Sequence, residues 1–306
     1  MDAPRPNFFI VGAPKSGTTA LYHYLRAHPE VFMPEYKEPH YFAPDLESYR
    51  YVSDEARYLS LFEPAAGVPR VGESSVYYLY SEEAARRIHA FAPEAKIIVM
   101  LRNPTDMIYS LHSQRLFSGH EDIGSFAEAL DAEPARREGK RIPENADPVK
   151  CLLYTDMGRY TEQVRRFFDA FGRESVHVIL YDDFAADTLG AYHEACTFLG
   201  VDPSVPLDDR VHNPNKTIRS QTLRDLTKFS PGFKRAVQSV LPRPARQWIA
   251  KRVYSLNTRY EKRAPLEPAL RARLARGYAQ EVRDLSDLLG RDLTGWTASD
   301  LQAAAA

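Results

Sequence analysis

The stretch Asn7-Phe-Phe-Ile-Val-Gly-Ala-Pro-Lys-Ser-Gly-Thr-Thr19, close to the start of the chain, decides the fold. Asn7 to Val11 is a short apolar run rich in β-forming residues, which is typical of a buried strand. Gly12 to Thr19 then combines glycines with hydroxyl side chains and one lysine. Apolar residues recur at helical spacing after this turn until His28-Pro29, where the helix ends. A strand, a glycine-containing turn and a helix in this order predict an anion site at the helix N-terminus.

The same order of strand, turn and helix recurs further along the chain. Lys96 to Leu101 reads KIIVML, the clearest buried strand, and Arg102-Asn103-Pro104 then opens another helix. Other apolar and periodic runs predict strands over Arg70–Glu73 and Val176–Tyr181, and helices over Ser81–Phe91, Tyr154–Phe171, Thr188–Leu199 and Glu267–Leu289. The alternation predicts an α/β fold with a P-loop-like central parallel sheet flanked by helices, and a mostly helical C-terminal part. Ligands of such sheets bind at the carboxyl ends of the strands.

Composition narrows the class of protein. The chain has 306 residues, 40 Lys and Arg against 41 Asp and Glu, and a hydrophobic share of 44%. These values are typical of a globular protein, and we interpret residues 1–306 as one domain. The balanced charge gives no support for nucleic-acid binding, and the two cysteines, Cys151 and Cys196, are too few for a disulfide framework or a cysteine zinc site. No apolar run approaches the roughly 18 residues that span a bilayer, so we expect a cytoplasmic protein.

Two segments depart from the average composition. Glu121 to Val149 has weak periodicity with several Pro and Gly residues, which favours a surface excursion over core, and we interpret residues 115–155 as a lid or acceptor-binding insertion. Arg210 to Arg252 holds 11 Lys and Arg against a single acid, so its net charge is +10. We expect residues 210–290 to form a basic loop and helical region. Local positive charge of this kind suits a phosphate-rich ligand.

The turn after the first strand offers the groups that bind phosphate. Gly17 allows close approach of the backbone, Ser16, Thr18 and Thr19 supply hydroxyl donors, and Lys15 supplies a positive charge. A Walker A loop would place Gly-Lys directly before Ser or Thr, whereas here Gly17 is followed by Thr18 and the lysine lies earlier. A nucleotide triphosphatase is therefore an alternative, although the loop departs from the Walker A pattern.

At this point the chain resembles a known family. Phe9-Ile-Val-Gly-Ala-Pro-Lys-Ser-Gly-Thr-Thr-Ala-Leu21, followed by His28-Pro29 and Lys37-Glu-Pro-His-Tyr-Phe42, is similar to the 5′-phosphosulfate loop of sulfotransferases that use 3′-phosphoadenosine 5′-phosphosulfate (PAPS). The similarity is greatest to the branch of bacterial and heparan sulfate sulfotransferases. It is strongest over residues 7–42 and 71–110 and becomes thinner towards residue 220. The resemblance implies the sulfotransferase fold, PAPS as co-substrate, 3′,5′-adenosine bisphosphate as product and no metal.

A second phosphate site is implied by the same resemblance. Arg102 follows the strand Lys96–Leu101, and Ser110 comes eight residues later. About two helical turns separate them, so both reach one phosphate only if Arg102 stays in the turn and its side chain folds back. The family pattern implies that Arg102 and Ser110 hold the 3′-phosphate that distinguishes PAPS from ATP.

The resemblance also implies a general base. In Val71-Gly-Glu-Ser-Ser-Val-Tyr-Tyr78, Glu73 falls on a glutamate that the heparan sulfate branch uses to take the acceptor proton. Ser74 and Val76 replace the family's lysine and proline, so contacts of that lysine are not carried over. A carboxylate at a strand end can act as a base if burial or its neighbours tune its basicity. His40 is the alternative base, because imidazole titrates in the useful range.

Later residues complete the candidate site. Lys216 and Arg219 lie in His212-Asn-Pro-Asn-Lys-Thr-Ile-Arg-Ser220, where sulfotransferases place a loop that closes over the nucleotide. Tyr181, in Tyr-Asp-Asp-Phe184, is similar to a family segment whose phenol approaches the nucleotide, although core packing is an equal alternative. Asp182 or Asp183 would instead bind magnesium if the protein were a kinase.

These observations predict an enzyme that transfers a sulfuryl group from PAPS to an acceptor hydroxyl by in-line displacement. Glu73 would remove the proton, and Lys15 would neutralise charge on the bridging oxygen of the leaving nucleotide. The acceptor stays open: a small molecule, a glycan or an acyl chain on a carrier protein, as in bacterial secondary metabolism. The alternatives are a P-loop kinase and a non-catalytic protein with a basic interaction surface. Contact with a membrane surface is not expected, because Pro242 and Pro244 interrupt the only suitable segment.

Overall fold

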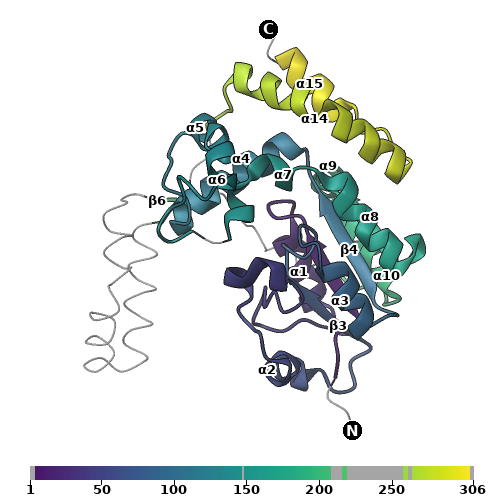
Figure 1. Ribbon diagram of the computed structural model, residues 1–306. Coiled ribbons are helices and arrows are strands. Elements are labelled where there is room, and N and C mark those ends of the chain that lie inside the picture. The colour runs from purple at the N-terminus through teal and green to yellow at the C-terminus, as the bar shows by residue number, and fades with distance from the viewer. Residues whose placement is uncertain (1–3, 147, 208–215, 219–257, 261–263, 304–306) are drawn as a thin grey trace, which may run out of the picture.

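The computed structural model describes residues 4–146, 148–207, 216–218, 258–260 and 264–303 (Figure 1). A five-stranded sheet lies at the centre, with the strand order β2-β3-β1-β4-β5 and every neighbouring pair parallel. The strands are β1 (Phe8–Gly12), β2 (Val31–Phe32), β3 (Arg70–Ser74), β4 (Lys96–Leu101) and β5 (Val176–Leu180). The predicted α/β class with a parallel central sheet is confirmed.

Helices connect successive strands and cover both faces of the sheet. The first half of the chain contributes α1 (Thr18–Ala27), α2 (Glu55–Ser60), α3 (Ala84–Phe91), α4 (Pro104–Ser118), α5 (Phe126–Asp131), α6 (Glu133–Arg137) and the short 3-10 turns η1 (Pro44–Tyr49) and η2 (Glu63–Ala65). The second half contributes η3 (Val149–Leu152), α7 (Tyr154–Met157), α8 (Tyr160–Phe171), η4 (Arg173–Ser175), α9 (Tyr181–Ala186), α10 (Thr188–Leu199), α14 (Pro268–Leu289) and α15 (Gly295–Ala303).

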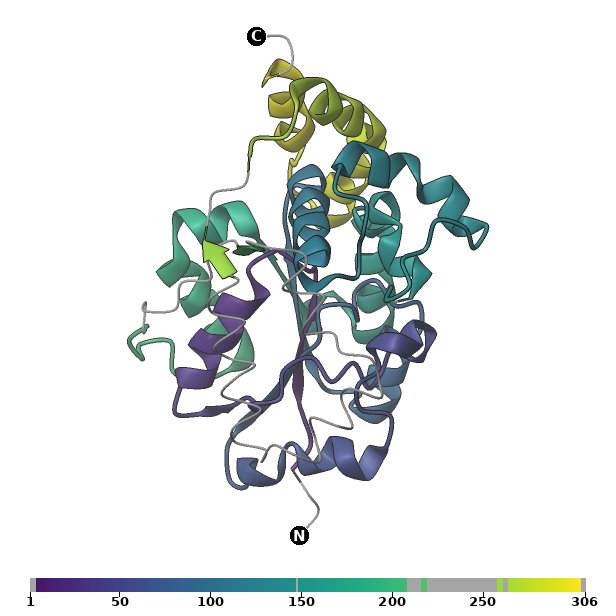
Figure 2. The same cartoon turned by 90° about the vertical axis from the view of Figure 1, so that its left-hand side faces the viewer.

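The alternation of side chains along β1 produces two cores. Phe8 and Ile10 face one side of the sheet, where they belong to a cluster with residues of α1 and α10. Phe9 and Val11 face the other side, in a cluster with residues of α3, α8 and α14. Figure 2 shows the sheet nearly edge-on, with α1 on one side of it. Because successive strand residues point to opposite faces, an entirely apolar strand such as β1 is stable only when both faces are covered.

The predicted helix over Tyr154–Phe171 is in fact two helices, α7 and α8, separated at Gly158 and Arg159. The Tyr278 hydroxyl of α14 donates to the Thr155 carbonyl at 3.0 Å, and this carbonyl would accept from the amide of Arg159 in a continuous helix. A Cβ at Gly158 would lie 2.4 Å from the same hydroxyl. Docking of α14 therefore breaks the helix. The spacing of apolar residues within 154–171 cannot predict this break, because it depends on a contact with another part of the chain.

The expectation that Glu121–Val149 lies on the surface is wrong for Glu121 and for the inner faces of α5 and α6, whereas residues 137–141 are exposed. Phe126 and Ala129 of α5 belong to the core, and the side chains of Glu121 and Arg136 are fully buried as an ion pair at 2.7 Å. Tyr154 donates to the second carboxylate oxygen of Glu121 at 2.9 Å. Short helices of five or six residues give little periodicity, so the sequence pattern understates their packing.

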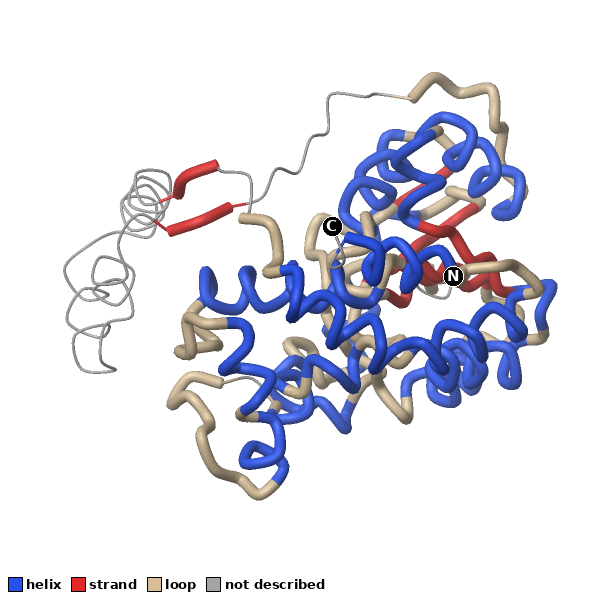
Figure 3. Tube along the Cα trace, turned by 90° about the horizontal axis from the view of Figure 1, so that it is seen from above, coloured by secondary structure: helices blue, strands red, loops and turns tan. Residues whose placement is uncertain are grey.

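Residues 264–303, the described part of the C-terminal region, are mostly helical, as predicted. Helix α14 buries the apolar positions expected from helical spacing, including Leu270, Leu274 and Tyr278, and α15 packs against it (Figure 1). The strands β6 (Lys216–Ile218) and β7 (Thr258–Tyr260) form an antiparallel pair that is separate from the central sheet (Figure 3). In the described part of the chain, every helix is too short or too polar to cross a bilayer.

Candidate functional site

The predicted phosphate loop lies at the carboxyl end of β1, between the strand and α1. Lys15 and Gly17 have positive φ angles of 61° and 93°, which turn the chain sharply before the helix. Ser16 and Thr18 are buried, whereas Lys15 and Thr19 are half-buried. Because the first N–H groups of a helix have no partner inside it, the start of α1 presents donors and the positive end of its dipole to the loop. The arrangement is suited to an anion such as a phosphosulfate.

The turn after β3 packs directly against this loop. Gly12 has a φ of 149°, and a Cβ there would lie 2.7 Å from the carbonyl oxygen of Val76 and from the Cβ of Leu79. The Leu79 amide donates to the Val11 carbonyl at 2.7 Å, so the turn adds to the end of β1. Glycine is therefore required at position 12 by the close approach of a second chain segment. This contact joins the phosphate loop to the segment that carries Glu73.

Glu73 lies on β3 beside β1, in register with Phe9, and its side chain is fully buried. Tyr58 of α2 and Tyr78 both donate to its Oε2, at 3.0 and 2.8 Å. Oε1 is also buried and has no hydrogen-bond partner among the described residues. Burial raises the pKa of Glu73 to about 7, although the hydroxyls of Ser75 and the two tyrosines favour the charged form. A carboxyl group of this pKa is half charged at neutral pH and can take a proton there.

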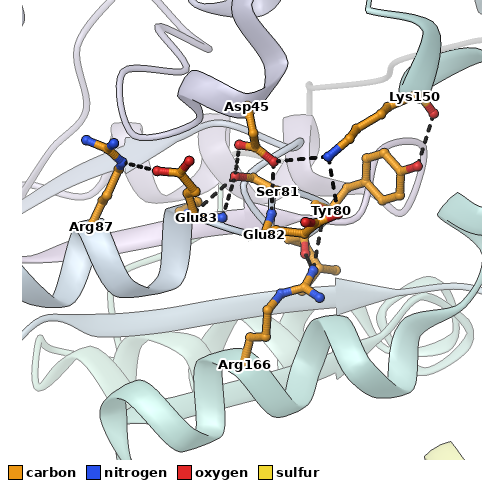
Figure 4. A network of polar contacts seen from close by, with 10 residues as sticks. Asp45, Tyr80, Ser81, Glu82, Glu83, Arg87, Lys150 and Arg166 are labelled. Carbon is orange, nitrogen blue, oxygen red and sulfur yellow. Dashed lines mark hydrogen bonds and ion pairs between the residues drawn. The ribbon is translucent and has the colours of Figure 1, made fainter.

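A polar network fixes the end of the turn that follows Glu73, at residues 79–84 (Figure 4). Ser81 donates to Asp45 of η1 and accepts from the amide of Ala84 at 3.1 Å, which satisfies the start of α3. Arg166 of α8 donates to the carbonyls of Leu79 and Tyr80. Since these contacts come from three separate elements, the turn after Glu73 is fixed from both sides.

The loop after β2 brings further charged groups to the phosphate loop. Lys37 forms an ion pair with Glu38, whose backbone amide donates to the Ser74 carbonyl at 3.0 Å. Burial opposes the charge on Glu38, but the charges of Lys37, His40 and Lys15 together hold its pKa below the usual value. Glu38 is therefore a charged carboxylate close to Lys15. Sequence reasoning did not assign a role to Lys37 or Glu38, although both belong to the Lys-Glu-Pro-His segment on which the resemblance rests.

His40, the alternative base, is fully buried behind this loop. Its backbone amide donates to the Ser75 hydroxyl at 3.0 Å, and its Nδ1 lies 2.9 Å from the Glu38 carbonyl. The ring packs against Tyr77 and Tyr78, with centroid distances of 5.5 and 6.0 Å. These contacts support the turn around Glu73, so the position of His40 is typical of a residue that orders the loop.

Arg102 lies in the turn between β4 and α4, as the second phosphate site requires. Its guanidinium stands 4.5 Å from the ring centroid of Tyr181 and approaches the Lys15 carbonyl at 3.5 Å. A Cβ at Gly17 would lie 3.3 Å from the Tyr181 ring. The structure therefore brings Lys15, Arg102 and Tyr181 together at one edge of the sheet. A guanidinium stacked on an aromatic ring is restricted in orientation and remains charged.

The remaining predicted nucleotide residues are only partly described. Ser110 is buried on α4, about two turns after Arg102. Lys216 begins β6, which lies beside α4, so its backbone is on the side of the molecule that carries Ser110. Arg219 lies outside the described residues, as does most of the basic segment Arg210–Arg252. Their contacts with a nucleotide stay predictions.

The two carboxylates that a kinase would need point to the C-terminal helices. Asp182 accepts a hydrogen bond from the indole N–H of Trp296 at 2.7 Å, and Asp183 forms a bidentate ion pair with Arg291. Both are occupied by structural contacts with the segment that contains α15. This arrangement gives no support for a magnesium site at either residue.

Helices α14 and α15 also contact the start of α4, directly after Arg102. Asn103 caps α4 by accepting from the Thr105 amide at 2.9 Å, and its Nδ2 donates to the Trp296 carbonyl at 2.9 Å. Arg271 of α14 bridges Asp106 of α4 and Asp300 of α15, at 2.7 and 2.6 Å. Helices far away in the sequence thus fix the turn that presents Arg102.

Comparisons with known proteins identify the family of this chain. A family profile described as "Sulfotransferase domain" matches residues 5–230. Carbohydrate sulfotransferase 15 of Mus musculus is 28% identical over 251 residues, covering 65% of this chain and 44% of its own length. The bifunctional heparan sulfate N-deacetylase/N-sulfotransferase 3 of Homo sapiens is 29% identical over 209 residues, covering 65% of this chain and 22% of its own length. The chain thus spans less than half the length of these curated relatives.

A solved structure extends the comparison to nearly the whole chain. The crystal structure of a sulfotransferase from Alicyclobacillus acidocaldarius has a TM-score of 0.72 and 31% sequence identity, covering 96% of this chain and 99% of that one. Together with the profile match, this shows that the chain belongs to the sulfotransferase domain family. The resemblance drawn from Phe9–Leu21 and Lys37–Phe42 is confirmed at the level of the family and the fold.

Proposed function

We propose that this protein transfers a sulfuryl group from PAPS to a hydroxyl group of an acceptor. The observation that carries the proposal is the contact between two segments: the phosphate loop with Lys15, and the turn that follows the buried carboxylate of Glu73. They meet at Gly12, so an anion held by the loop would lie on the same edge of the sheet as a carboxyl group able to accept a proton. Family membership supports the reaction class.

The residues present fit a nucleotide with phosphate groups at both ends. The start of α1, with Ser16, Thr18 and Thr19, suits the 5′-phosphosulfate, and Lys15 is the nearest cation. Arg102, stacked on Tyr181, supplies a second cation at the end of β4 for a 3′-phosphate, with Ser110 as the proposed partner. In this proposal Lys15 and the loop dipoles balance the charge of the phosphosulfate.

In the proposed reaction, the acceptor oxygen forms a bond to sulfur while the bond from sulfur to the bridging phosphate oxygen breaks. The acceptor proton passes to Oε1 of Glu73, the oxygen that has no partner among the described residues. Lys15 stabilises the negative charge that develops on the bridging oxygen. Because Glu73 is covered in the free protein, binding of the acceptor has to open the residues over it.

The acceptor class is proposed from the relatives. One curated relative is named as a carbohydrate sulfotransferase and the other as a heparan sulfate N-sulfotransferase, so a carbohydrate is the first class of acceptor to test, with its hydroxyl groups as the proposed site. Small hydroxylated molecules and acyl chains on carrier proteins follow, since their hydroxyl groups need the same base and the same phosphate loop.

The test combines nucleotide binding with transfer of label. We expect 3′,5′-adenosine bisphosphate to raise the melting temperature without magnesium, and ATP with magnesium to have a smaller effect. Incubation with ³⁵S-labelled PAPS and a panel of hydroxylated acceptors should label one class. Lys15→Ala should reduce transfer by about a hundredfold or more, because it removes a charge aimed at the leaving group. Absence of protection by the bisphosphate would contradict the proposal.

The base is tested separately by two isosteric variants. We expect Glu73→Gln to lose transfer by about a hundredfold or more while still binding the bisphosphate, because a general base contributes roughly this factor. Glu38→Gln is the comparison, since Glu38 is also near Lys15 but has a lowered pKa and is paired with Lys37. Transfer that survives Glu73→Gln and disappears in Glu38→Gln would move the role of base to Glu38.

A further inference from the structure

The hydrogen bonds to Glu73 are unevenly divided between its two oxygens. Oε2 accepts from Tyr58 at 3.0 Å and from Tyr78 at 2.8 Å. Oε1 is buried and accepts from no described residue. The two phenols come from different elements, because Tyr58 belongs to α2 and Tyr78 to the turn after β3. One oxygen is therefore saturated and the other is left for a further donor.

We infer that Tyr58 and Tyr78 are positioning residues for the proposed base: they hold the carboxylate by Oε2, so that Oε1 alone receives the acceptor proton. This inference rests on the proposed function, since it assigns these residues to the reaction of Glu73. Without the phenols, the carboxylate would be free to rotate and either oxygen could face the acceptor. A fixed carboxylate avoids this reorganisation during the reaction.

The packing of both rings makes the phenols rigid. Tyr58 stacks on Tyr41 with a centroid distance of 4.4 Å and an interplanar angle of 14°, and its edge meets Phe42 and Phe62. Tyr78 contacts Phe42 and His40. Burial and the charge of Glu73 raise the pKa of both tyrosines well above the usual value, so both stay protonated and act as donors.

Other groups that face Glu73 also act on its charge, and the Ser75 hydroxyl favours the charged form at least as strongly as either phenol. Ser75 lies in the same turn and Lys37 in the loop after β2, and both favour the carboxylate. His40 contacts the Tyr78 ring, and the electrostatic effect of Tyr41 contributes to the raised pKa of Tyr58. Removing one phenol would therefore leave a carboxylate that is still buried but less stabilised. Its pKa should rise, because hydrogen bonds to the charged form lower it.

Tyr58→Phe is the most informative variant. Among the described residues, the Tyr58 hydroxyl donates a hydrogen bond to Glu73 and to no other group, so the substitution removes one hydrogen bond and keeps the ring. Tyr78→Phe also frees the amide of Phe42, which donates to the Tyr78 oxygen at 3.3 Å. Tyr278→Phe is the matched control, since it removes a buried hydroxyl that donates to a backbone carbonyl in another part of the molecule.

The experiment measures the titration of Glu73 and the pH profile of transfer in each variant. Infrared difference spectra between pH 5 and pH 9, with Glu73→Gln as the blank, report the carboxyl group without any acceptor. We expect the midpoint to move up by about one pH unit in Tyr58→Phe, and further in the double variant with Tyr78→Phe. The value of kcat/KM should then fall about tenfold or more at pH 6 and less at pH 9, where only the loss of orientation remains. Tyr278→Phe should keep the wild-type midpoint.

The possible outcomes separate this inference from the proposed function. An unchanged carboxyl midpoint in both phenylalanine variants overturns the role of the tyrosines, and so does a kcat/KM that keeps the wild-type value at every pH. If wild-type protein transfers no label to any acceptor, the proposed function fails, while the infrared titration still reports whether the phenols act on Glu73. Melting temperatures of the variants show whether each one is folded.

Discussion

At the scale of single residues, Gly17 is a position where the phosphate loop tolerates little change. Its φ is 93°, and an added Cβ would lie 3.2 Å from Met100 and 3.3 Å from Tyr181. We expect Gly17→Ala to lower the free energy of unfolding by about 1–2 kcal/mol, because an L-residue is strained at this angle. The bisphosphate should also protect the variant less. Urea denaturation with and without the nucleotide measures both effects.

Gly277 provides the control for this prediction. It lies within α14, and a Cβ there would meet nothing within 4 Å. Gly277→Ala should therefore raise the free energy of unfolding by about 0.5–1 kcal/mol through helix propensity. Equal stability of Gly17→Ala and wild type would show that the loop is not constrained as the structure indicates.

The residues of the proposed phosphate loop could be recognised because they are consecutive. Lys15 to Thr19 form one turn, and their chemistry is visible in the sequence without knowledge of the rest of the chain. Tyr58 could not be predicted, because its bond to Glu73 depends on where α2 docks, and no local pattern encodes that. Lys37 and Glu38 were visible as a motif, but their proximity to Lys15 is a tertiary contact.

At the scale of secondary-structure elements, the alternation of strands and helices was sufficient to predict the parallel sheet, but it did not predict the short edge strand β2. Long apolar runs such as β4 carry a strong pattern, and its position was predicted without error. Strand β2 has two residues, which is too short for any period, and it forms only by pairing with β3. The helix break at Gly158 and the burial of Glu121 with Arg136 likewise follow from packing between elements.

Arg271 tests how far the C-terminal helices control the proposed nucleotide site. It is partly buried and bridges Asp106 of α4 to Asp300 of α15. We expect Arg271→Gln to lower the free energy of unfolding by about 1–3 kcal/mol, because Asp300 is nearly buried and would lose its charged partner. Affinity for the bisphosphate should fall as well, since the start of α4 follows Arg102. Chemical denaturation and calorimetric titration measure the two effects.

Arg273→Gln is the matched control on the same helix. Its pair with Asp131 is exposed on both sides, so its removal should change stability by less than about 1 kcal/mol and leave nucleotide affinity unchanged. Similar losses in the two variants would mean that charge on α14 as a whole, and not the bridge of Arg271, supports the site.

At the scale of the whole molecule, the distribution of charge matters more than its sum. The net charge of −1 includes a stretch of +10 at Arg210–Arg252, most of which lies outside the described residues. Within the described part, Lys15, Lys37 and Arg102 gather at the carboxyl edge of the sheet, and Glu38 is the carboxylate close to them. Such a local field favours a multiply charged anion at this edge, whatever the total charge of the chain.

The stability of the whole protein should depend on pH through Glu73. Burial raises its folded-state pKa from 4.5 to about 7, so the folded protein holds this proton more tightly than the unfolded chain. The corresponding stabilisation is complete below pH 4.5 and is lost as the pH rises through 7, a change of about 3 kcal/mol. Glu38 and Glu121, whose pKa values are lowered, act in the opposite direction, because their contribution is lost as the pH falls.

The difference in the free energy of unfolding between wild type and Glu73→Gln isolates the effect of Glu73. Urea denaturation of both proteins from pH 5 to pH 8 should give a difference that grows in favour of the variant with rising pH, and a constant difference would mean that Glu73 titrates normally.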